Sequence, residues 1–146
     1  MARVLYVEDD ATHRKFHVDA FKAAGHEVTA CIDYPSAQVA LKAALESNKP
    51  YDIIVSDGQY PGDGKRFTAG THHKYQGSAC LLHDHKILRL TAPVVVLSGA
   101  PEFLEQNPYP AHCTRPLHIL HKLDIRPREV AANIPAYIAE GMAPRG

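Results

Sequence analysis

Val4-Leu5-Tyr6-Val7-Glu8-Asp9 is a short apolar run that ends in two acids, and Ile53-Ile54-Val55-Ser56-Asp57 is a second run that ends in one. Runs rich in Val and Ile, without polar alternation, are typical of strands buried on both faces of a parallel sheet. The carboxyl ends of such strands meet at one edge of the sheet, where α/β proteins bind ligands. The sequence therefore predicts that Glu8, Asp9 and Asp57 lie close together.

Three carboxylates at one edge of a sheet need a counter-charge. Two unit charges of the same sign about 4 Å apart repel by roughly 4 kcal/mol near a protein surface. The cluster is therefore tolerated only if a cation neutralises it or one carboxyl stays protonated. A hard divalent ion such as Mg²⁺ is the best match for a site made of oxygen atoms. We expect Mg²⁺ to bind at this edge.

The composition limits the class of protein. A chain of 146 residues with 45% hydrophobic residues suits one domain with a single core. Its 16 basic and 16 acidic residues balance, so we expect neither direct DNA binding nor attraction to an acidic membrane. Cys31, Cys80 and Cys113 are widely spaced and odd in number, which favours free thiols in a reducing compartment. Without a signal-peptide pattern or a long apolar stretch, we expect a cytoplasmic protein.

Strand and helix patterns alternate in the first half of the chain, which is typical of a parallel sheet with helices on both faces. Asp10 is placed to cap a helix with Phe16 and Phe21 in the core. Residues 26–32 resemble an edge strand, because one face is polar. A second helix should start at Pro35 and end at Asn48, followed by central strands at 52–56 and 93–97.

The second half of the chain is less regular. Residues 58–77 contain five glycines and no periodicity, which predicts an unusually long loop before a helix at 78–90. After Ser98 the chain is rich in proline and leaves room for a short helix at 102–106 and a brief strand at 111–114.

The C-terminal part gives the weakest pattern. Helical patches are expected at 117–123 and 128–140, the latter in two pieces because Pro127 and Pro135 interrupt the pattern. We expect a main domain over residues 1–123 and a helical extension over 124–146 that packs on it or trails from it.

Together these stretches resemble the receiver domain of bacterial two-component response regulators. The matching residues follow in the expected order: Val4 to Asp10, Asp52 to Asp57 with Pro61 four residues on, Pro93 to Ala100, and Arg115-Pro116. The resemblance covers about residues 3 to 123. It implies a flavodoxin-like, doubly wound α/β fold of five parallel strands in the order 2-1-3-4-5. The region of the fourth helix and fifth strand should be shortened, and the segment between the third strand and third helix enlarged.

The resemblance also implies a metal site. Mg²⁺ would be held by Asp9, by Asp57 and by the backbone carbonyl of Gln59, and by Glu8 through water. A metal that bridges a carboxylate and a phosphoryl group removes the repulsion between their negative charges.

The implied chemistry is the transfer of a phosphoryl group to Asp57 from a sensor histidine kinase or a phosphotransfer protein. Ser98 would hydrogen-bond a phosphoryl oxygen, and Arg115 would supply the positive contact. Such a chain is not an enzyme in the ordinary sense, because it catalyses only its own phosphoryl transfer and dephosphorylation. It would signal through contacts with a separate output protein, and the resemblance leaves open whether it forms a homodimer.

Two positions depart from the family pattern. Arg115 stands where a lysine usually precedes proline across a cis bond, and we expect Arg115-Pro116 to be cis as well. His112 stands where an aromatic residue usually rotates on activation. These departures support an alternative, namely a receiver-like scaffold that binds a partner independently of phosphorylation.

Two further hypotheses rank lower. His72, His73, His83 and His85 with Cys80 suggest a transition-metal site, but His83 and His85 would point to different faces of a helix. A metal-dependent phosphohydrolase would need a second acid close after Asp57, and the sequence lacks one. The other histidines, such as His13, His17, His118 and His121, are expected to be solvated helix residues.

Overall fold

The computed structural model describes residues 1–68 and 70–143, with only the backbone at residues 71 and 72. In these residues one parallel sheet has the strand order β2-β1-β3-β4-β5. The strands are β1 (Arg3–Val7), β2 (Glu27–Cys31), β3 (Ile53–Asp57), β4 (Val94–Ser98) and β5 (His118–His121). The predicted flavodoxin-like fold with the order 2-1-3-4-5 is confirmed.

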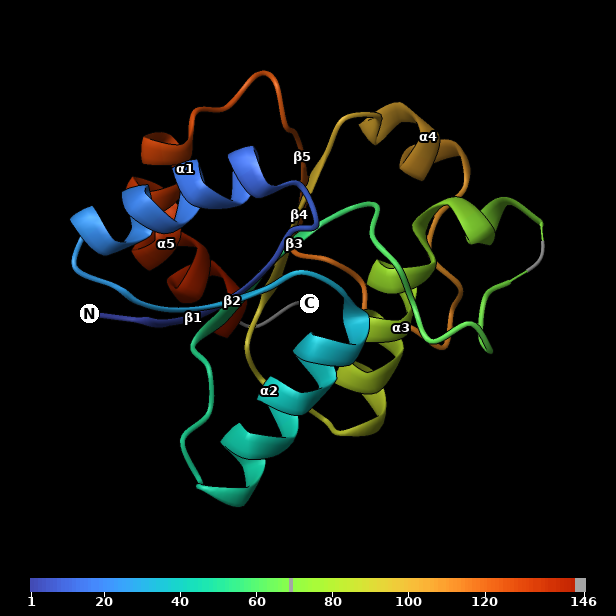
Figure 1. Cartoon of the computed structure of the whole chain (residues 1–146), viewed down its shortest axis with the longest axis horizontal. Helices are drawn as coiled ribbons and strands as arrows, with labels where there is room; N and C mark the ends of the chain where they lie inside the picture. The colour runs from blue at the N-terminus through green and yellow to red at the C-terminus, as the bar shows by residue number, and fades with distance from the viewer. Residues whose placement is uncertain (69, 144–146) are drawn as a thin grey trace.

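Helices cover both faces of this sheet (Figure 1). α1 (Ala11–Ala23) and α5 (Pro127–Met142) lie on one face, and α2 (Tyr34–Glu46) and α3 (Gln76–Ile87) lie on the other. The six-residue α4 (Pro101–Gln106) follows β4, and a 3₁₀ helix, η1 (Gly70–Tyr75), precedes α3. The short α4 and the long connection between β3 and α3 agree with the predicted departures from a regular receiver fold.

The sheet separates two apolar clusters. Successive side chains of a strand point to opposite faces, so Val4 packs with Phe21 under α1, whereas Leu5 packs with Leu41 and Leu81 under α2 and α3. β1, β3 and β4 are buried on both faces, apart from Arg3 at the start of β1. The strands that carry the acids are therefore held rigidly from both sides.

The first helix differs from the prediction in which residue it buries. Asp10 caps α1 as expected, because its carboxylate accepts a hydrogen bond from the backbone of His13 at 2.9 Å. Phe16, however, is 57% exposed, so its assignment to the core is wrong. His17 is buried instead, with its ring centroid 5.3 Å from that of Tyr6, so it is not a solvated residue. His17 and Phe21 lie one turn apart, and that face of α1 is the one that meets the sheet.

The edge strand and the second helix form as expected. β2 is at one edge of the sheet and is only partly buried. Asp33 caps α2 with a hydrogen bond from the backbone of Ser36, and Pro35 occupies the first turn. Gly25, at the end of α1, has a φ of 87°, which a residue without a Cβ adopts at little cost.

Arg66 anchors the long connection between β3 and α3. Its guanidinium pairs with Asp63 and with Asp84 of α3, each at 2.9 Å, and donates to the hydroxyl of Tyr34 in α2 at 2.7 Å. The expected loop is thus tied to both helices on its side of the sheet. Its last part forms η1, and α3 starts at Gln76, two residues before the predicted start.

The last strand and the last helix differ from the sequence-based expectations. β5 is His118–His121, so the predicted strand at 111–114 and the predicted helical patch at 117–123 are wrong. α5 runs without a break through Pro135, although a proline inside a helix costs about 3 kcal/mol. Buried side chains on both sides of Pro135 hold this helix against the core: Val130, Ala131, Ile134 and Tyr137. Most of the predicted C-terminal extension is therefore part of the main core, and residues 144–146 lie outside the described part.

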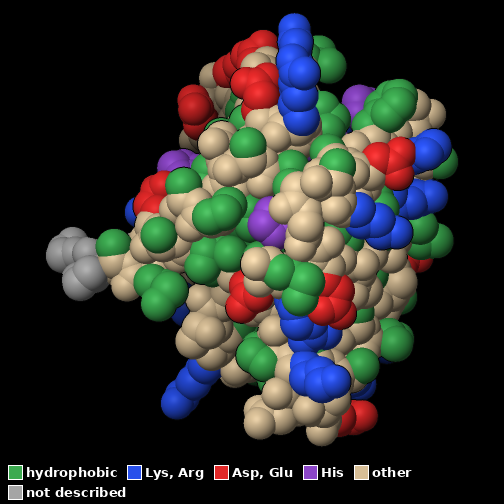
Figure 2. All heavy atoms as spheres, turned by 90° about the vertical axis from the view of Figure 1, so that its left-hand side faces the viewer, with side chains coloured by type: hydrophobic (Ala, Val, Ile, Leu, Met, Phe, Trp, Pro, Cys, Tyr) green, Lys and Arg blue, Asp and Glu red, His purple; other side chains and the backbone are tan. Residues whose placement is uncertain are grey.

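The outer surface near α1 and α5 carries both signs of charge. Figure 2 shows acidic and basic side chains interspersed with apolar ones on this side of the molecule. Of the helices formed by residues 1–68 and 70–143, none combines the length and the apolar character needed to cross a membrane.

Candidate functional site

Three acids converge at the carboxyl ends of β1 and β3. β1 and β3 are parallel neighbours with Val7 opposite Ser56, so Glu8 and Asp9 emerge beside Asp57. One carboxylate oxygen of each acid lies within 4.8 Å of the others. Glu8 is fully buried and Asp57 is 8% exposed, whereas Asp9 is open to solvent. The predicted meeting of these acids is confirmed.

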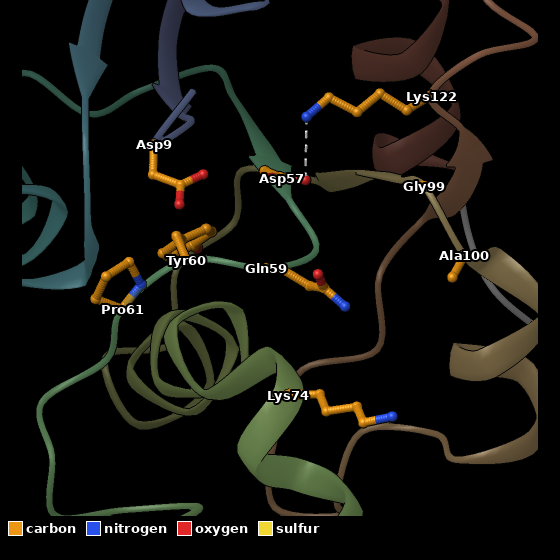
Figure 3. A pocket seen from close by; sticks show the side chains of 9 residues that line it. All are labelled: Asp9, Asp57, Gln59, Tyr60, Pro61, Lys74, Gly99, Ala100 and Lys122. Carbon is orange, nitrogen blue, oxygen red and sulfur yellow. Dashed lines mark ion pairs between the residues drawn. The ribbon is translucent and has the colours of Figure 1, made fainter. Parts of the chain in front are cut away.

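Asp9 and Asp57 line a pocket with a volume of about 480 Å³, and Glu8 is buried behind them. Figure 3 shows that Asp9 and Asp57 face this pocket, and that Gln59 follows from the loop after β3. Two lysines from distant parts of the chain complete its polar lining, Lys74 of η1 and Lys122 after β5. The predicted site residue Gln59 is therefore in place beside the acids.

Lys122 is the cation that contacts the acids. Its ammonium donates to Glu8 Oε1 and lies 3.5 Å from Asp57 Oδ1. Sequence reasoning missed this residue because β5 was placed too early in the chain. A usable signal was present, since Lys122 directly follows the His-Ile-Leu-His run of β5.

Arg115 does not take the predicted position. It lines a separate groove with Tyr109 and Leu117, before β5 begins. The peptide bonds of the described residues are all trans, so the prediction of a cis bond before Pro116 is wrong. The Arg-Pro pair therefore does not mark the end of the fifth strand in this chain.

His112 is also displaced from its expected place. Its ring stacks on Phe67 with centroids 5.5 Å apart and meets the ring of His83 edge-on at 5.1 Å. The residue three positions before Lys122 is Ile119, in β5. This position in β5 is thus occupied by an aliphatic residue, and the imidazole of His112 packs against the long loop.

Ser98 is the last residue of β4 and lies next to the site, behind the wall of the pocket. Its side chain is buried, and its hydroxyl accepts a hydrogen bond from the backbone of Ala100 at 3.0 Å. A Cβ placed on Gly58 would lie 3.3 Å from Ser98 Oγ, so this serine packs tightly against the residue after Asp57. Gly99 and Ala100 form the pocket wall in front of it.

Burial and proximity shift the ionisation of the acids. Burial, together with the hydrogen bond and charge of Glu8, raises the pKa of Asp57 to about 8. Burial also disfavours the Glu8 anion, but hydrogen bonds from the Asp57 carboxyl and from Lys122 outweigh this and lower its pKa. The pKa of Asp9 is raised by partial burial and by the charge of Glu8. The two shifts are opposite in sign, so the protonated form is favoured at Asp57 and the charged form at Glu8.

The donor set fits a hard divalent cation. Three carboxylates meet here, and the ammonium of Lys122 pairs with two of them, Glu8 and Asp57. Their oxygen atoms are close enough to share one ion. Oxygen ligands and an excess of negative charge are the conditions that Mg²⁺ requires. Asp9, Asp57 and the Gln59 carbonyl would hold the ion, with Glu8 behind them.

The described histidines do not form the alternative metal site. His83 Nδ1 accepts from Arg66 at 2.6 Å, whereas His85 contacts Thr114 Oγ1 and the Ala92 carbonyl on the buried side of α3. Glu8, Asp9 and Asp57 are the only cluster of potential ligands among the described residues. The side chain of His72 lies outside the described part.

The comparison with known proteins rests on structure alone. No family model matches the chain, and no curated protein matches it. A response regulator receiver domain protein from Clostridium thermocellum has a TM-score of 0.65 at 15% identity, with 95% of each chain covered. The receiver domain of the Francisella response regulator 1452 has a TM-score of 0.63 at 20% identity, covering 95% of this chain and 98% of that one.

A third similar structure is a CheY-like receiver domain protein from Methanospirillum hungatei JF-1. It has a TM-score of 0.65 at 17% identity, with 97% of this chain and 96% of that chain covered. These structures match nearly the whole length of the chain. With five parallel strands in the order 2-1-3-4-5 and helices on both faces, this chain has the fold of a response regulator receiver domain.

Proposed function

We propose that the chain is a phosphoacceptor receiver that takes a phosphoryl group onto Asp57 and signals through protein contacts. The supporting observation is that the oxygens of Glu8, Asp9 and Asp57 lie within 4.8 Å of one another, with the ammonium of Lys122 3.5 Å from Asp57. The similarity to receiver domains supports the same function. The donor is a sensor histidine kinase or a phosphotransfer protein in the cytoplasm, and the output partner is a separate protein.

Phosphoryl transfer begins when Asp57 loses its proton. A carboxylate oxygen of Asp57 then attacks the phosphorus of a phosphohistidine, and an oxygen–phosphorus bond forms. The phosphorus–nitrogen bond of the donor breaks, its electron pair stays on the imidazole nitrogen, and that nitrogen takes a proton from solvent. When bound, Mg²⁺ reduces the repulsion between the carboxylate and the phosphoryl oxygens.

The neighbouring residues position the reacting groups. Glu8 holds the ammonium of Lys122 beside Asp57, where it stabilises negative charge on the transferred group. Asp9 and the Gln59 carbonyl complete the metal ligands. Ser98 would have to turn its hydroxyl from the backbone of Ala100 toward the pocket before it donates to a phosphoryl oxygen.

Intact mass spectrometry tests the proposal. The protein is incubated with acetyl phosphate and Mg²⁺, and we expect a gain of one phosphoryl group. Asp57→Asn should abolish the gain because it removes the nucleophilic carboxylate. Asp19→Asn, an exposed substitution in α1, is the matched control and should retain it. Absence of any gain in the wild-type protein would contradict the proposal.

The same experiment addresses the alternative function. A scaffold that binds its partner independently of phosphorylation would show no mass gain and equal partner binding by the wild-type protein and Asp57→Asn. One of the reasons for that alternative is the arginine at the expected lysine position, along with His112 and the shortened region of the fourth helix. Lys122 now supplies the lysine, so phosphorylation is the better supported function.

A further inference from the structure

Lys74 lies at the same pocket as Asp57, although it belongs to the irregular connection between β3 and α3. It is the fifth residue of η1, and its side chain lines the pocket together with Lys122. In Figure 3 the two lysines lie on opposite sides of Asp57 and Gln59. Lys122 points to Asp57, whereas the side chain of Lys74 does not point to it. The pocket therefore has two cations, and only Lys122 is paired with the acids.

The backbone that carries Lys74 is held firmly. The next residue, Tyr75, is fully buried and donates its hydroxyl to the Asn107 carbonyl at 2.6 Å. Its ring packs against Phe103 and Tyr109 with centroid distances of 5.9 and 4.9 Å. Lys74 thus extends from a fixed base, whereas its own side chain is exposed and can change rotamer.

The Lys74 ammonium lies over an aromatic ring of α4. Nζ is 5.0 Å from the centroid of Phe103. A cation–π contact at an exposed site is weaker than a charge-assisted hydrogen bond to an anion. An anion in the pocket would therefore draw this ammonium away from the ring.

Phosphorylation creates such an anion. A phosphoryl group brings about 1.5 to 2 negative charges and three acceptor oxygens. Lys122 already donates to Glu8, and a bound divalent ion would offset the charge of the carboxylates. One flexible ammonium with three donors remains at the pocket to meet the added charge.

We propose that Lys74 is a second phosphoryl-binding cation. Its ammonium moves away from the ring of Phe103 in α4 and contacts the phosphoryl group on Asp57. This inference rests on the proposed function, because it takes Asp57 as the phosphoacceptor. It gives η1 a direct role in the phosphorylated state. It also connects occupancy of the pocket to α4, since the ring of Phe103 loses its cation when the group is present.

Beryllium trifluoride with Mg²⁺ is the probe, because it mimics a phosphoryl group on a carboxylate. Its apparent affinity is measured by fluorine NMR for the wild type, Lys74→Gln, Lys74→Arg and Lys65→Gln. We expect Lys74→Gln to weaken binding about tenfold, as the loss of one charge-assisted hydrogen bond implies. Lys74→Arg should stay within about threefold of the wild type, and Lys65→Gln, an exposed lysine of the same connection, should equal it.

Two controls make the result specific. The thermal midpoint of the unligated protein should be the same in all four proteins, because the Lys74 side chain is exposed. The ring resonances of Phe103 should shift on adding the probe to the wild type and shift less in Lys74→Gln. A merely structural role of Lys74 would not produce this difference.

The outcomes separate the two proposals. Equal affinity in the wild type and Lys74→Gln, or equal losses in Lys74→Gln and Lys74→Arg, would overturn the role of Lys74 and leave phosphorylation of Asp57 standing. If the wild-type protein neither binds the probe nor accepts a phosphoryl group, both proposals are overturned. The measurement on the wild-type protein is enough to detect this outcome.

Discussion

Lys122 contacts both buried acids of the pocket, since its ammonium donates to Glu8 and lies 3.5 Å from Asp57 Oδ1. Glu8 follows β1, Asp57 ends β3 and Lys122 follows β5, so the contact joins three strands of the sheet. Burial alone would lower the pKa of Lys122, but the hydrogen bond to Glu8 and the nearby charge of Asp57 raise it. The lysine is therefore charged at neutral pH and provides a positive contact for Asp57.

Replacing Lys122 and Arg115 in turn tests which of the two cations supports phosphorylation. Lys122→Ala should slow phosphorylation by acetyl phosphate by about 10² to 10³, which is the usual effect of losing one positioned electrostatic group. Arg115→Ala should leave the rate unchanged, because Arg115 lines another groove. Rates are measured by intact mass against time. If Arg115→Ala slowed phosphorylation and Lys122→Ala did not, Arg115 would be the positive contact that the sequence analysis expected.

Magnesium should stabilise the folded protein through Asp9. At a concentration 100 times its dissociation constant, an ion that binds only the folded state adds about 2.7 kcal/mol to the free energy of unfolding. Urea unfolding with and without Mg²⁺ measures this increment. Asp9→Asn should lose most of it, because a metal ligand is removed.

Asp10→Asn is the matched control for the metal experiment. Asparagine caps a helix about as well as aspartate, and the Asp10 carboxylate is directed to the backbone of His13. This variant should therefore keep most of the increment. If both variants respond to Mg²⁺ as the wild type does, Asp9 is not a ligand.

Gly77 should be intolerant of a side chain. A Cβ at this position would lie 2.4 Å from the carbonyl oxygen of Tyr60, and that carbonyl accepts a hydrogen bond from the Gly77 backbone at 3.1 Å. We expect Gly77→Ala to lower the free energy of unfolding by about 1 to 3 kcal/mol, the usual range for overpacking. A Cβ on Gly99 would have no neighbour within 4 Å, so Gly99→Ala should cost less than about 0.5 kcal/mol. Equal urea midpoints for the two variants would contradict this packing argument.

His85 should make the stability of the protein depend on pH. Burial outweighs the hydrogen bond to the Ala92 carbonyl and lowers the pKa of this imidazole. A histidine with a lowered folded pKa contributes fully above its unfolded pKa of about 6.5, and this contribution is lost as pH falls toward the folded pKa. The stability advantage of the wild type over His85→Gln should therefore shrink between pH 7.5 and 5, by about 1.4 kcal/mol for each unit of lowering.

The difference between the two proteins is the quantity to follow. The raised pKa of Asp57 has the opposite effect on the free energy of unfolding. The folded state favours the neutral carboxyl of Asp57, and this contribution is lost as the pH rises toward 8. That contribution is common to both proteins and cancels in the difference. A difference that stays constant with pH would show that His85 is protonated equally in the folded and unfolded states.

The strands that are buried on both faces could be predicted, because burial there restricts the sequence to apolar residues. Val4 to Val7 and Ile53 to Val55 have no polar alternation, so their strands and the meeting of their acids followed from the pattern. β5 has four half-buried residues with a histidine at each end, which is a weak strand signal. Its position depends on the hydrogen bond between Leu117 and Val94 and on parallel pairing with β4, contacts that periodicity does not encode.

The errors at individual residues have a related cause. Hydrophobicity favoured Phe16 over His17 for the core, but the orientation of α1 on the sheet buries the imidazole against Tyr6. Lys74 lines the pocket from a connection that the Arg66–Asp84 ion pair and the Tyr75–Asn107 hydrogen bond hold in place. Neither contact can be inferred from residues adjacent in sequence.

The position of β5 at the margin of the sheet has a consequence for the site. β5 is paired on one side only, to β4, and is the shortest of the five strands. A marginal strand can detach locally at a lower free energy than global unfolding requires. Detachment would withdraw Lys122 and leave Glu8, Asp9 and Asp57 in place on β1 and β3. Local detachment of this margin would therefore separate Lys122 from Asp57 without unfolding the strands that carry the acids.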